Sequence, residues 1–176
     1  MESRILILGL GNPLLSDEGM GVRALGLLSE RYALPPAVAC LDGGVLGLGL
    51  LAYLEGVTHL LVIDTVQNGL EPGALVRLTG ADIPRSLSLK LSIHELGFQE
   101  VLAISELRGI PAPTLTVLGL EPASLAPGVG LSPTVEAGLG SLVDAAVAEL
   151  GGWGVAALPR WDPESRNEHF ASPDIS

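Results

Sequence analysis

Apolar residues in this chain gather in short runs that are bounded by glycine, proline or charged residues. Five of these runs have the length of a strand, and most of them show no strict alternation of apolar and polar positions. They cover residues 4–9, 37–41, 59–64, 74–78 and 114–118. Short, nearly continuous apolar runs are typical of strands that are buried on both faces of a sheet.

The stretches between the runs carry helical signals. Ser92 and Glu95 form a capping box, in which each side chain satisfies a backbone N–H of the first helical turn. Ser132 followed by Pro133 is also typical of a helix start. The predicted helices cover residues 16–31, 46–55, 92–108 and 132–150.

The order of these elements indicates the fold class. Strands that alternate with helices predict an α/β fold, with a mostly parallel sheet covered by helices on both faces. The length of 176 residues suits one domain with a single sizeable core. We expect this domain to span residues 1–152 and the polar, proline-containing residues 153–176 to form a partly disordered C-terminal tail.

Charge and hydropathy exclude several classes of partner. The chain has 9 Lys and Arg against 20 Asp and Glu, and its net charge of −11 repels nucleic acid and anionic lipid. Hydrophobic residues make up 48% of the chain. The longest apolar run, 45–54, is nevertheless only about ten residues long, whereas a membrane-spanning helix needs roughly 18. The first residues do not resemble a signal peptide, so we expect a cytoplasmic protein with no membrane partner.

Cys40 is the only cysteine of the chain. A single cysteine excludes an intrachain disulfide and a thiolate metal cluster. Because its neighbours are apolar, we expect the Cys40 side chain to be buried.

Three side chains with metal-binding chemistry fall where predicted strands end or helices begin. Glu18 follows the first strand, Asp64 ends the third, and His94 lies in the first turn of the capped helix. Ligand sites of parallel sheets lie beyond the carboxyl ends of the strands, so these groups could meet at one edge. Mixed oxygen and nitrogen donors suit zinc or nickel, and three protein ligands leave positions open for a substrate group.

Each of the three also has a purely structural explanation. The acidic residues at 17 and 18 would equally stabilise the start of a helix, and Asp64 would equally cap the turn after its strand. A helix N-terminus favours the neutral imidazole that binds metal, but His94 there would also fit an ordinary surface position. The three residues are far apart, and no short-range metal motif is present.

Asp42 is a fourth candidate, because it precedes two glycines that would let a bound chain approach the backbone closely. A plain loop with Asp42 as its cap is the alternative.

Taken in order, several motifs resemble those of the hydrogenase maturation endopeptidases. The resemblance spans about residues 4–150. The motifs are Ile-Leu-Gly-Leu-Gly-Asn at 7–12, Asp-Glu-Gly-Met-Gly-Val at 17–22, Leu-Asp-Gly-Gly at 41–44, Val-Ile-Asp at 62–64 with Pro-Gly at 72–73, Ser-Ile-His at 92–94 with Leu-Gly at 96–97 and Val-Leu at 101–102, Gly-Leu-Glu-Pro at 119–122, and Gly-Leu-Ser-Pro-Thr-Val at 130–135. The chain departs from the family at Val45, where threonine is usual, which puts in doubt any role of that hydroxyl.

The resemblance implies a three-layer α/β/α fold around a twisted five-stranded sheet. It implies an endopeptidase that removes the C-terminal extension of the large-subunit precursor of a nickel–iron hydrogenase after nickel insertion. It places the metal contacts on Glu18, Asp64 and His94, with the nickel arriving in the precursor; zinc would also fit these donors in vitro. Family members are often classed as aspartic-type peptidases, and Asp17 and Asp42 are the candidate catalytic bases here.

Two rival interpretations stay open at this stage. Gly-Leu-Gly-Asn-Pro at 9–13 also resembles the start of peptidyl-tRNA hydrolases, although the histidine that this family needs is missing and the charge suits tRNA badly. A metal-dependent module that binds the large subunit without cutting it is the second rival, because a catalytic water leaves no mark in a sequence.

Overall fold

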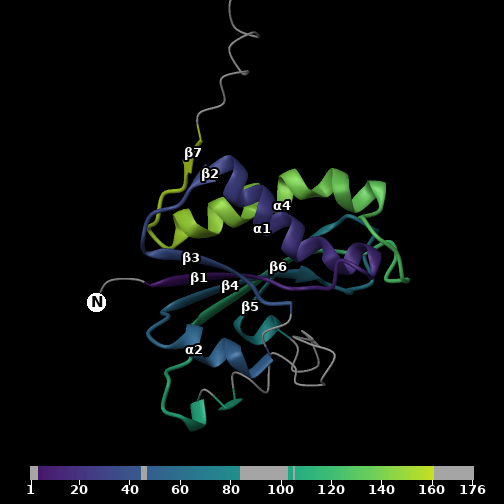
Figure 1. The fold of residues 1–176 in the computed structure, drawn as a ribbon. Coiled ribbons are helices and arrows are strands. Elements are labelled where there is room, and N and C mark those ends of the chain that lie inside the picture. The colour runs from purple at the N-terminus through teal and green to yellow at the C-terminus, as the bar shows by residue number, and fades with distance from the viewer. Residues whose placement is uncertain (1–3, 45–46, 84–102, 105, 161–176) are drawn as a thin grey trace, which may run out of the picture.

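The computed structural model describes residues 4–44, 47–83, 103–104 and 106–160. Five strands form one sheet in the order β3-β1-β4-β6-β5. All neighbours in the sheet are parallel except β5 and β6, which are antiparallel. The strands are β1 (Ile5–Gly9), β3 (Val38–Asp42), β4 (His59–Thr65), β5 (Leu75–Thr79) and β6 (Thr114–Leu120). The five predicted strands and the mostly parallel sheet are therefore confirmed (Figure 1).

The antiparallel strand β5 has a physical reason. Only the turn at 66–74 separates it from β4, and this is shorter than the dozen or so residues that a parallel crossover needs. The chain therefore turns back and places β5 at the far edge of the sheet, beside β6.

The helices differ from the predictions mainly at their ends. The predicted helix 16–31 is a 3-10 turn, η1 (Ser16–Gly19), followed by α1 (Met20–Arg31). The predicted helix 46–55 is the 3-10 turn η2 (Gly47–Leu50) and one α-helical turn, α2 (Leu51–Leu54), and a further 3-10 turn, η3 (Gly80–Asp82), follows β5. For the predicted helix 92–108, residues 92–102 and 105 lie outside the described residues, and 103–104 and 106–107 are helical.

The last predicted helix is confirmed as α4 (Pro133–Gly152). Ser132 is its N-cap, as the sequence predicted, because the Ser132 hydroxyl accepts a hydrogen bond from the Val135 backbone N–H at 3.4 Å. No helix in the described parts of the chain is long and apolar enough to cross a membrane.

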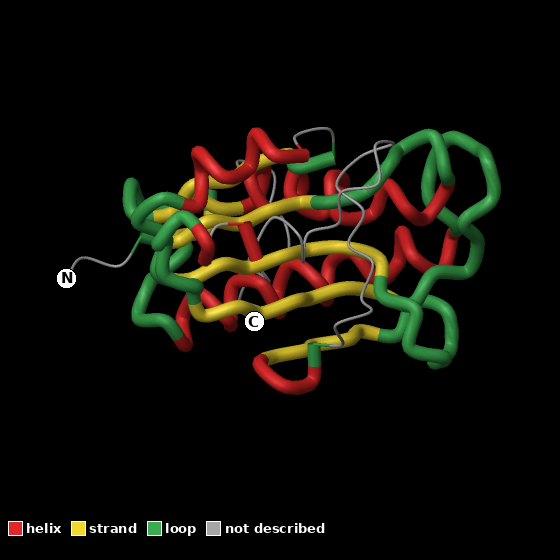
Figure 2. The backbone as a smooth tube through the Cα atoms, turned by 90° about the horizontal axis from the view of Figure 1, so that it is seen from below, coloured by secondary structure: helices red, strands yellow, loops and turns green. Residues whose placement is uncertain are grey.

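The sheet separates two apolar cores, which gives three layers, with α1 and α4 on one face and α2 on the other (Figure 1). Figure 2 looks onto the sheet from below and shows its strands lying side by side. Side chains of a strand alternate between its two faces, so neighbouring positions enter different cores. In β4, Leu61 and Ile63 pack with α1 and α4, whereas Leu60 and Val62 pack with α2 on the other face.

Residues 153–160, which the sequence assigned to the tail, pack against the domain. Strand β7 (Leu158–Pro159) pairs antiparallel with β2 (Tyr32–Ala33). The ring of Trp153 lies 4.9 Å from that of His59, at the start of β4. The predicted, partly disordered tail covers residues 153–176, and its remaining part, 161–176, is outside the described part of the chain.

The expectation that Cys40 is buried was wrong. Cys40 is exposed, because β3 is an edge strand, and among the described residues no strand lies on its outer side. An apolar run predicts a strand, but it does not tell a central strand from an edge strand.

Candidate functional site

Three acidic side chains gather at the carboxyl edge of the sheet. Asp42 is the last residue of β3, Asp64 the last but one of β4, and Glu18 lies in η1, which follows β1. In Figure 1 this edge is on the right, where the segment before α1 meets the loop before α4. This is the edge at which ligands bind in sheets of this class.

Asp64 is a buried carboxyl group with an altered acidity. Only 8% of its surface is exposed. Burial and, as a smaller effect, the negative charge of Glu18 raise the pKa of Asp64 to about 7, against the lowering effect of hydrogen bonds from Thr65. These bonds come from the Thr65 backbone N–H at 2.7 Å and the Thr65 hydroxyl at 3.3 Å, both to Oδ1. Within the described residues, no hydrogen bond is made to Asp64 Oδ2.

Glu18 is half-buried and close enough to Asp64 for its charge to act on that group. Its backbone is fixed by the bond from Glu18 N–H to the Leu15 carbonyl, at 3.1 Å. Gly11, with a φ of 124°, lies directly against the Glu18 carbonyl, and a Cβ at position 11 would collide with it. The glycine of the first motif therefore sets how closely η1 approaches the end of β1.

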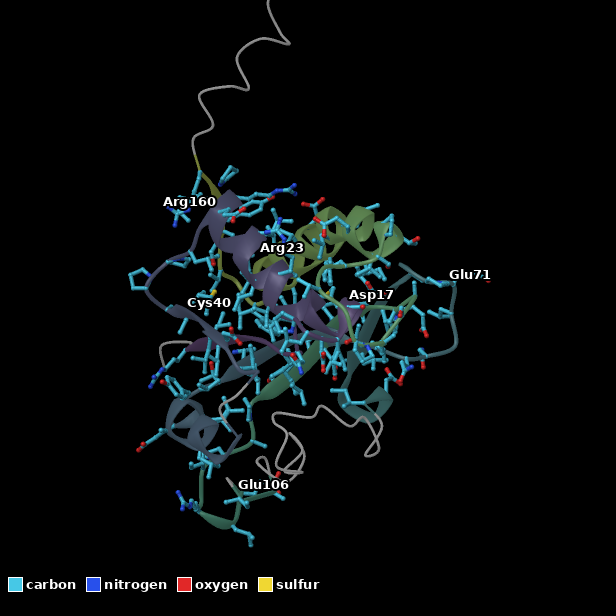
Figure 3. The ribbon with its side chains drawn as sticks, turned by 45° about the vertical axis from the view of Figure 1, so that its right-hand side comes forward. Asp17, Arg23, Cys40, Glu71, Glu106 and Arg160 are labelled. Atoms are coloured by element: carbon cyan, nitrogen blue, oxygen red, sulfur yellow. The ribbon has the colours of Figure 1, made fainter. Side chains whose placement is uncertain are left out.

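Asp17 makes a different kind of contact. It is fully buried, and its carboxylate accepts four hydrogen bonds. The donors are the backbone N–H groups of Ala123, Ser124 and Ser132, at 2.9, 3.0 and 2.6 Å, and the Ser132 hydroxyl, at 2.9 Å. Burial alone would raise the pKa of Asp17, but these hydrogen bonds outweigh it and hold the pKa below its usual value. Figure 3 shows Asp17 at the junction between η1 and the loop before α4.

The loop 121–132 is thus attached to the segment that carries Glu18. Besides the bonds to Asp17, the Ser16 hydroxyl donates to the Ala126 carbonyl at 2.9 Å, and the Ser16 backbone N–H donates to the Gly128 carbonyl at 2.9 Å. Glu121, at the start of the loop, accepts hydrogen bonds from the backbone of Asn68 and Gly69. The sequence analysis missed this network, because its donors are mostly backbone groups that no residue type reveals.

Asp17 was a candidate catalytic base, and the structure does not support that role. A base must accept a proton from water, but hydrogen bonds within the protein already occupy both oxygens of this buried carboxylate. Asp17 instead has a structural role, and the motif Asp-Glu at 17–18 combines a buried anchor with the half-buried candidate ligand Glu18.

Asp42 remains available as a base. Its side chain is exposed, and only its Oδ1 receives a hydrogen bond within the described residues, from the Gly44 backbone N–H at 3.0 Å. Asp42 pairs with Gly9 of β1, and Gly9 pairs with Ile63 of β4, so Asp42 is level with Ile63, the residue before Asp64. By strand alternation, Asp42 therefore belongs to the face of α1 and α4, whereas Asp64 belongs to the opposite face at the same edge. At about 4.8 Å per strand, the two backbones are about 10 Å apart.

His94 lies outside the described residues, so its place relative to Glu18 and Asp64 stays a prediction. The described residues before and after the segment that contains His94 indicate on which face of the sheet this segment is attached. Ile83 and Ile104 both pack on the core that contains Leu60 and Val62. Strand alternation directs Asp64 to this same face. The segment that carries His94 therefore begins and ends on the face of the sheet to which Asp64 belongs.

The acidic edge fits a cation. The negative charge of Glu18 raises the pKa of Asp64, and a positive ion between the two carboxyl groups would offset this repulsion. Within the described residues, no group of three or more possible ligands is assembled, so the pair would need the imidazole of His94 to complete the predicted donor set.

A cavity of about 610 Å³ lies elsewhere in the molecule. It is lined by the first residues of β6 and by Arg77, Glu149 and Trp153, at the end of the sheet opposite to Asp64. Arg77 and Glu149 are joined there by an ion pair at 2.9 Å, and the Thr116 hydroxyl donates to Glu149 at 2.8 Å. The cavity is therefore separate from the acidic edge.

Comparisons with known proteins give a consistent picture. A family model described as hydrogenase maturation protease matches residues 22–149. The hydrogenase expression/formation protein HupD of Bradyrhizobium diazoefficiens is 40% identical over 176 residues, which are 99% of this chain and 92% of that protein. The hydrogenase 2 maturation protease of Escherichia coli strain K12 is 40% identical over 158 residues, 89% of this chain and 96% of that protein. Among solved structures, the hydrogenase maturating endopeptidase HybD from E. coli matches with a TM-score of 0.81 and 40% identity, over 89% of this chain and 98% of its own.

Proposed function

The chain belongs to the hydrogenase maturation protease family and is therefore a peptidase, and we propose that it removes the C-terminal extension of a nickel–iron hydrogenase large-subunit precursor in the cytoplasm. Two of its relatives are named for hydrogenase formation or maturation, and their matches extend over most of both chains. The rival interpretation as a peptidyl-tRNA hydrolase finds no support in these matches.

We propose that Glu18, Asp64 and His94 bind the nickel that the precursor carries. Nickel then belongs to the substrate, and its presence at the acidic edge places the end of the precursor there. The observation that supports this most strongly is Asp64, a buried carboxyl group whose pKa is raised to about 7 beside a second carboxylate. Such a pair costs folding free energy, and a divalent cation would offset this cost.

Hydrolysis also needs a water molecule near the scissile carbonyl and a group that takes its proton. We propose Asp42 for this step, because its carboxylate is exposed at the same edge, whereas that of Asp17 is committed to the loop 121–132. Asp42 would take a proton from water as the oxygen attacks the carbonyl, and would return it to the amine that leaves. The reaction consumes one water and one peptide bond and needs no oxidant or reductant.

The experiment that tests this function uses a hydrogenase large-subunit precursor with and without nickel. After incubation with the protein, intact mass spectrometry should show a shortened chain only for the nickel-loaded precursor. An unshortened precursor in a stable complex would favour the binding module instead, and equal cleavage of both precursors would contradict recognition through nickel.

A further inference from the structure

Three apolar side chains lie exposed beside the acidic edge and form what we call the apolar rim: Leu14, Leu125 and Val129. Leu14 is 66% exposed and Val129 is 88% exposed. The loop segment 122–131 contains no charged residue, although the whole chain has 20 Asp and Glu. Single exposed apolar side chains are common, but several that gather on one uncharged segment mark a candidate contact region.

The rim is built from two segments that are far apart in the sequence. The Gly128 backbone N–H donates to the Leu14 carbonyl at 2.9 Å, and Leu15 and Gly128 form a parallel β-bridge. Leu14 and Val129 are each one residue away from this bridge. The backbone therefore holds residues 14 and 129 close together, although 115 positions separate them in the chain.

The rim is also held rigidly. The carboxylate of Asp17 binds the backbone of Ala123 and Ser124 on one side of the loop and Ser132 on the other. Pro122 and Pro127 further restrict the backbone between these anchors. A surface that is already ordered before binding loses little conformational entropy when a partner settles on it. The buried carboxylate of Asp17, with its four hydrogen bonds, thus holds the loop that carries the apolar rim in place.

The position of the rim indicates its partner. Leu14 lies four positions before Glu18 on the same segment, and the η1 turn that follows Leu14 is attached to the loop of Val129. A polypeptide with its scissile bond at the acidic edge would pass directly beside this surface. The acidic groups of the edge would repel an acidic segment, whereas the uncharged rim accepts an apolar one at no electrostatic cost.

We propose that the apolar rim is a docking surface for an apolar stretch of the precursor polypeptide next to the scissile bond. This inference rests on the proposed function, because the precursor is the partner in both. Continuity with the acidic edge favours the substrate over a second copy of this chain as the occupant.

The test compares steady-state cleavage of the nickel-loaded precursor by Leu14→Asp and Val129→Asp variants with cleavage by Leu158→Asp. Leu158 is a matched control, because it is 63% exposed and lies in β7, away from the rim. We expect each rim variant to raise KM at least about tenfold with little change in kcat, and the control to match the wild type. Leu14→Ser and Val129→Ser, which remove the apolar group without adding charge, should raise KM in the same direction.

Two results would overturn the docking surface. If the wild type cleaves the precursor and all rim variants keep its KM, the proposed function stands and the rim has no part in it. If the wild type is a dimer that the rim variants dissociate without a change in KM, the occupant is a second copy. A wild type that leaves the nickel-loaded precursor intact would instead remove the proposed function, and the rim proposal with it. Circular dichroism of each variant verifies that the fold is retained.

Discussion

Asp17 and Ser132 are joined by two hydrogen bonds across 115 positions of sequence: the Ser132 backbone N–H donates to Asp17 Oδ1 at 2.6 Å, and the Ser132 hydroxyl donates to Oδ2 at 2.9 Å. Ser132 is also the N-cap of α4. One contact therefore ties the turn that carries Glu18 to the start of the longest described helix. The acidic edge and the helical layer are held together at this point.

Replacing Asp17 should destabilise the whole domain. In Asp17→Asn the side-chain amide faces backbone N–H groups that need an acceptor. We therefore expect the free energy of unfolding to fall by about 3 kcal/mol or more. Urea denaturation measures this loss. Asp144→Asn on the exposed side of α4 is the control, and it should unfold at the wild-type urea concentration. Equal midpoints for the two variants would show that Asp17 is not an anchor.

The same contact has a pH dependence. The folded-state pKa of Asp17 is lower than its ordinary value of 3.8. Its contribution to stability is therefore complete above this value and is lost as the pH falls through the lower, folded-state pKa. The wild type should be more stable than Asp17→Asn, and this difference should shrink when denaturation is repeated below pH 4. A difference that grew on acidification would contradict the lowered pKa of Asp17.

Asp64 should show the opposite pH dependence. Because its folded-state pKa is about 7 and its ordinary value 3.8, the metal-free folded protein favours the protonated form. The stabilisation from this proton is complete below the ordinary pKa and is lost as the pH rises through 7. Relative to Asp64→Asn, the free energy of unfolding of the wild type should fall by up to about 4 kcal/mol between pH 4 and pH 8.

Denaturation in the presence of a chelator measures this difference. The Glu18→Gln variant serves as a second readout, because removing the Glu18 charge should lower the pKa of Asp64 and shift the loss to lower pH. A stability difference between wild type and Asp64→Asn that does not change with pH would contradict a buried, protonated Asp64.

Two glycines in α1 should respond in opposite ways to alanine. A Cβ at Gly21 would collide with the backbone carbonyls of Leu10 and Ile63, so Gly21→Ala should cost at least about 2 kcal/mol and push α1 off the sheet. Gly26 has nothing within 4 Å of such a Cβ, and Gly26→Ala should stabilise the helix by about 0.5–1 kcal/mol. Thermal unfolding of both variants checks the pair; a neutral Gly21→Ala would mean that α1 is not packed as closely as described.

The role proposed for Asp42 can be separated from metal binding. Asp42→Asn keeps an oxygen that can accept the Gly44 N–H bond but cannot take a proton from water. We expect kcat to fall by about 100-fold or more while KM for the nickel-loaded precursor stays near the wild-type value. An unchanged kcat would assign the proton transfer to another group.

The layers of the fold could be predicted from the sequence because the signals are local. Continuous apolar runs marked all five strands, and the Ser-Pro pair at 132–133 marked the start of α4. The pattern does not contain the order of strands in the sheet. For that reason the exposure of Cys40 on an edge strand and the place of β5 beside β6 could not be predicted.

The candidate site was predictable to a similar degree. Glu18 and Asp64 lie where predicted strands end, and this position predicted both at the carboxyl edge. The effect of the Glu18 charge on the pKa of Asp64 agrees with that prediction. The difference in role between Asp17 and its neighbour Glu18 was not predictable, because it depends on backbone donors in a loop more than 100 positions away. A single sequence shows residue types, whereas anchoring depends on which backbone groups the fold brings near.

The proposed function depends on the binding of the precursor's nickel by Glu18, Asp64 and His94 together. The most direct test is intact mass spectrometry of the nickel-loaded precursor after incubation with Glu18→Gln, Asp64→Asn and His94→Ala variants, each verified as folded. Our account predicts that all three leave the precursor at full length under conditions in which the wild type shortens it completely. Normal shortening by all three variants would contradict it.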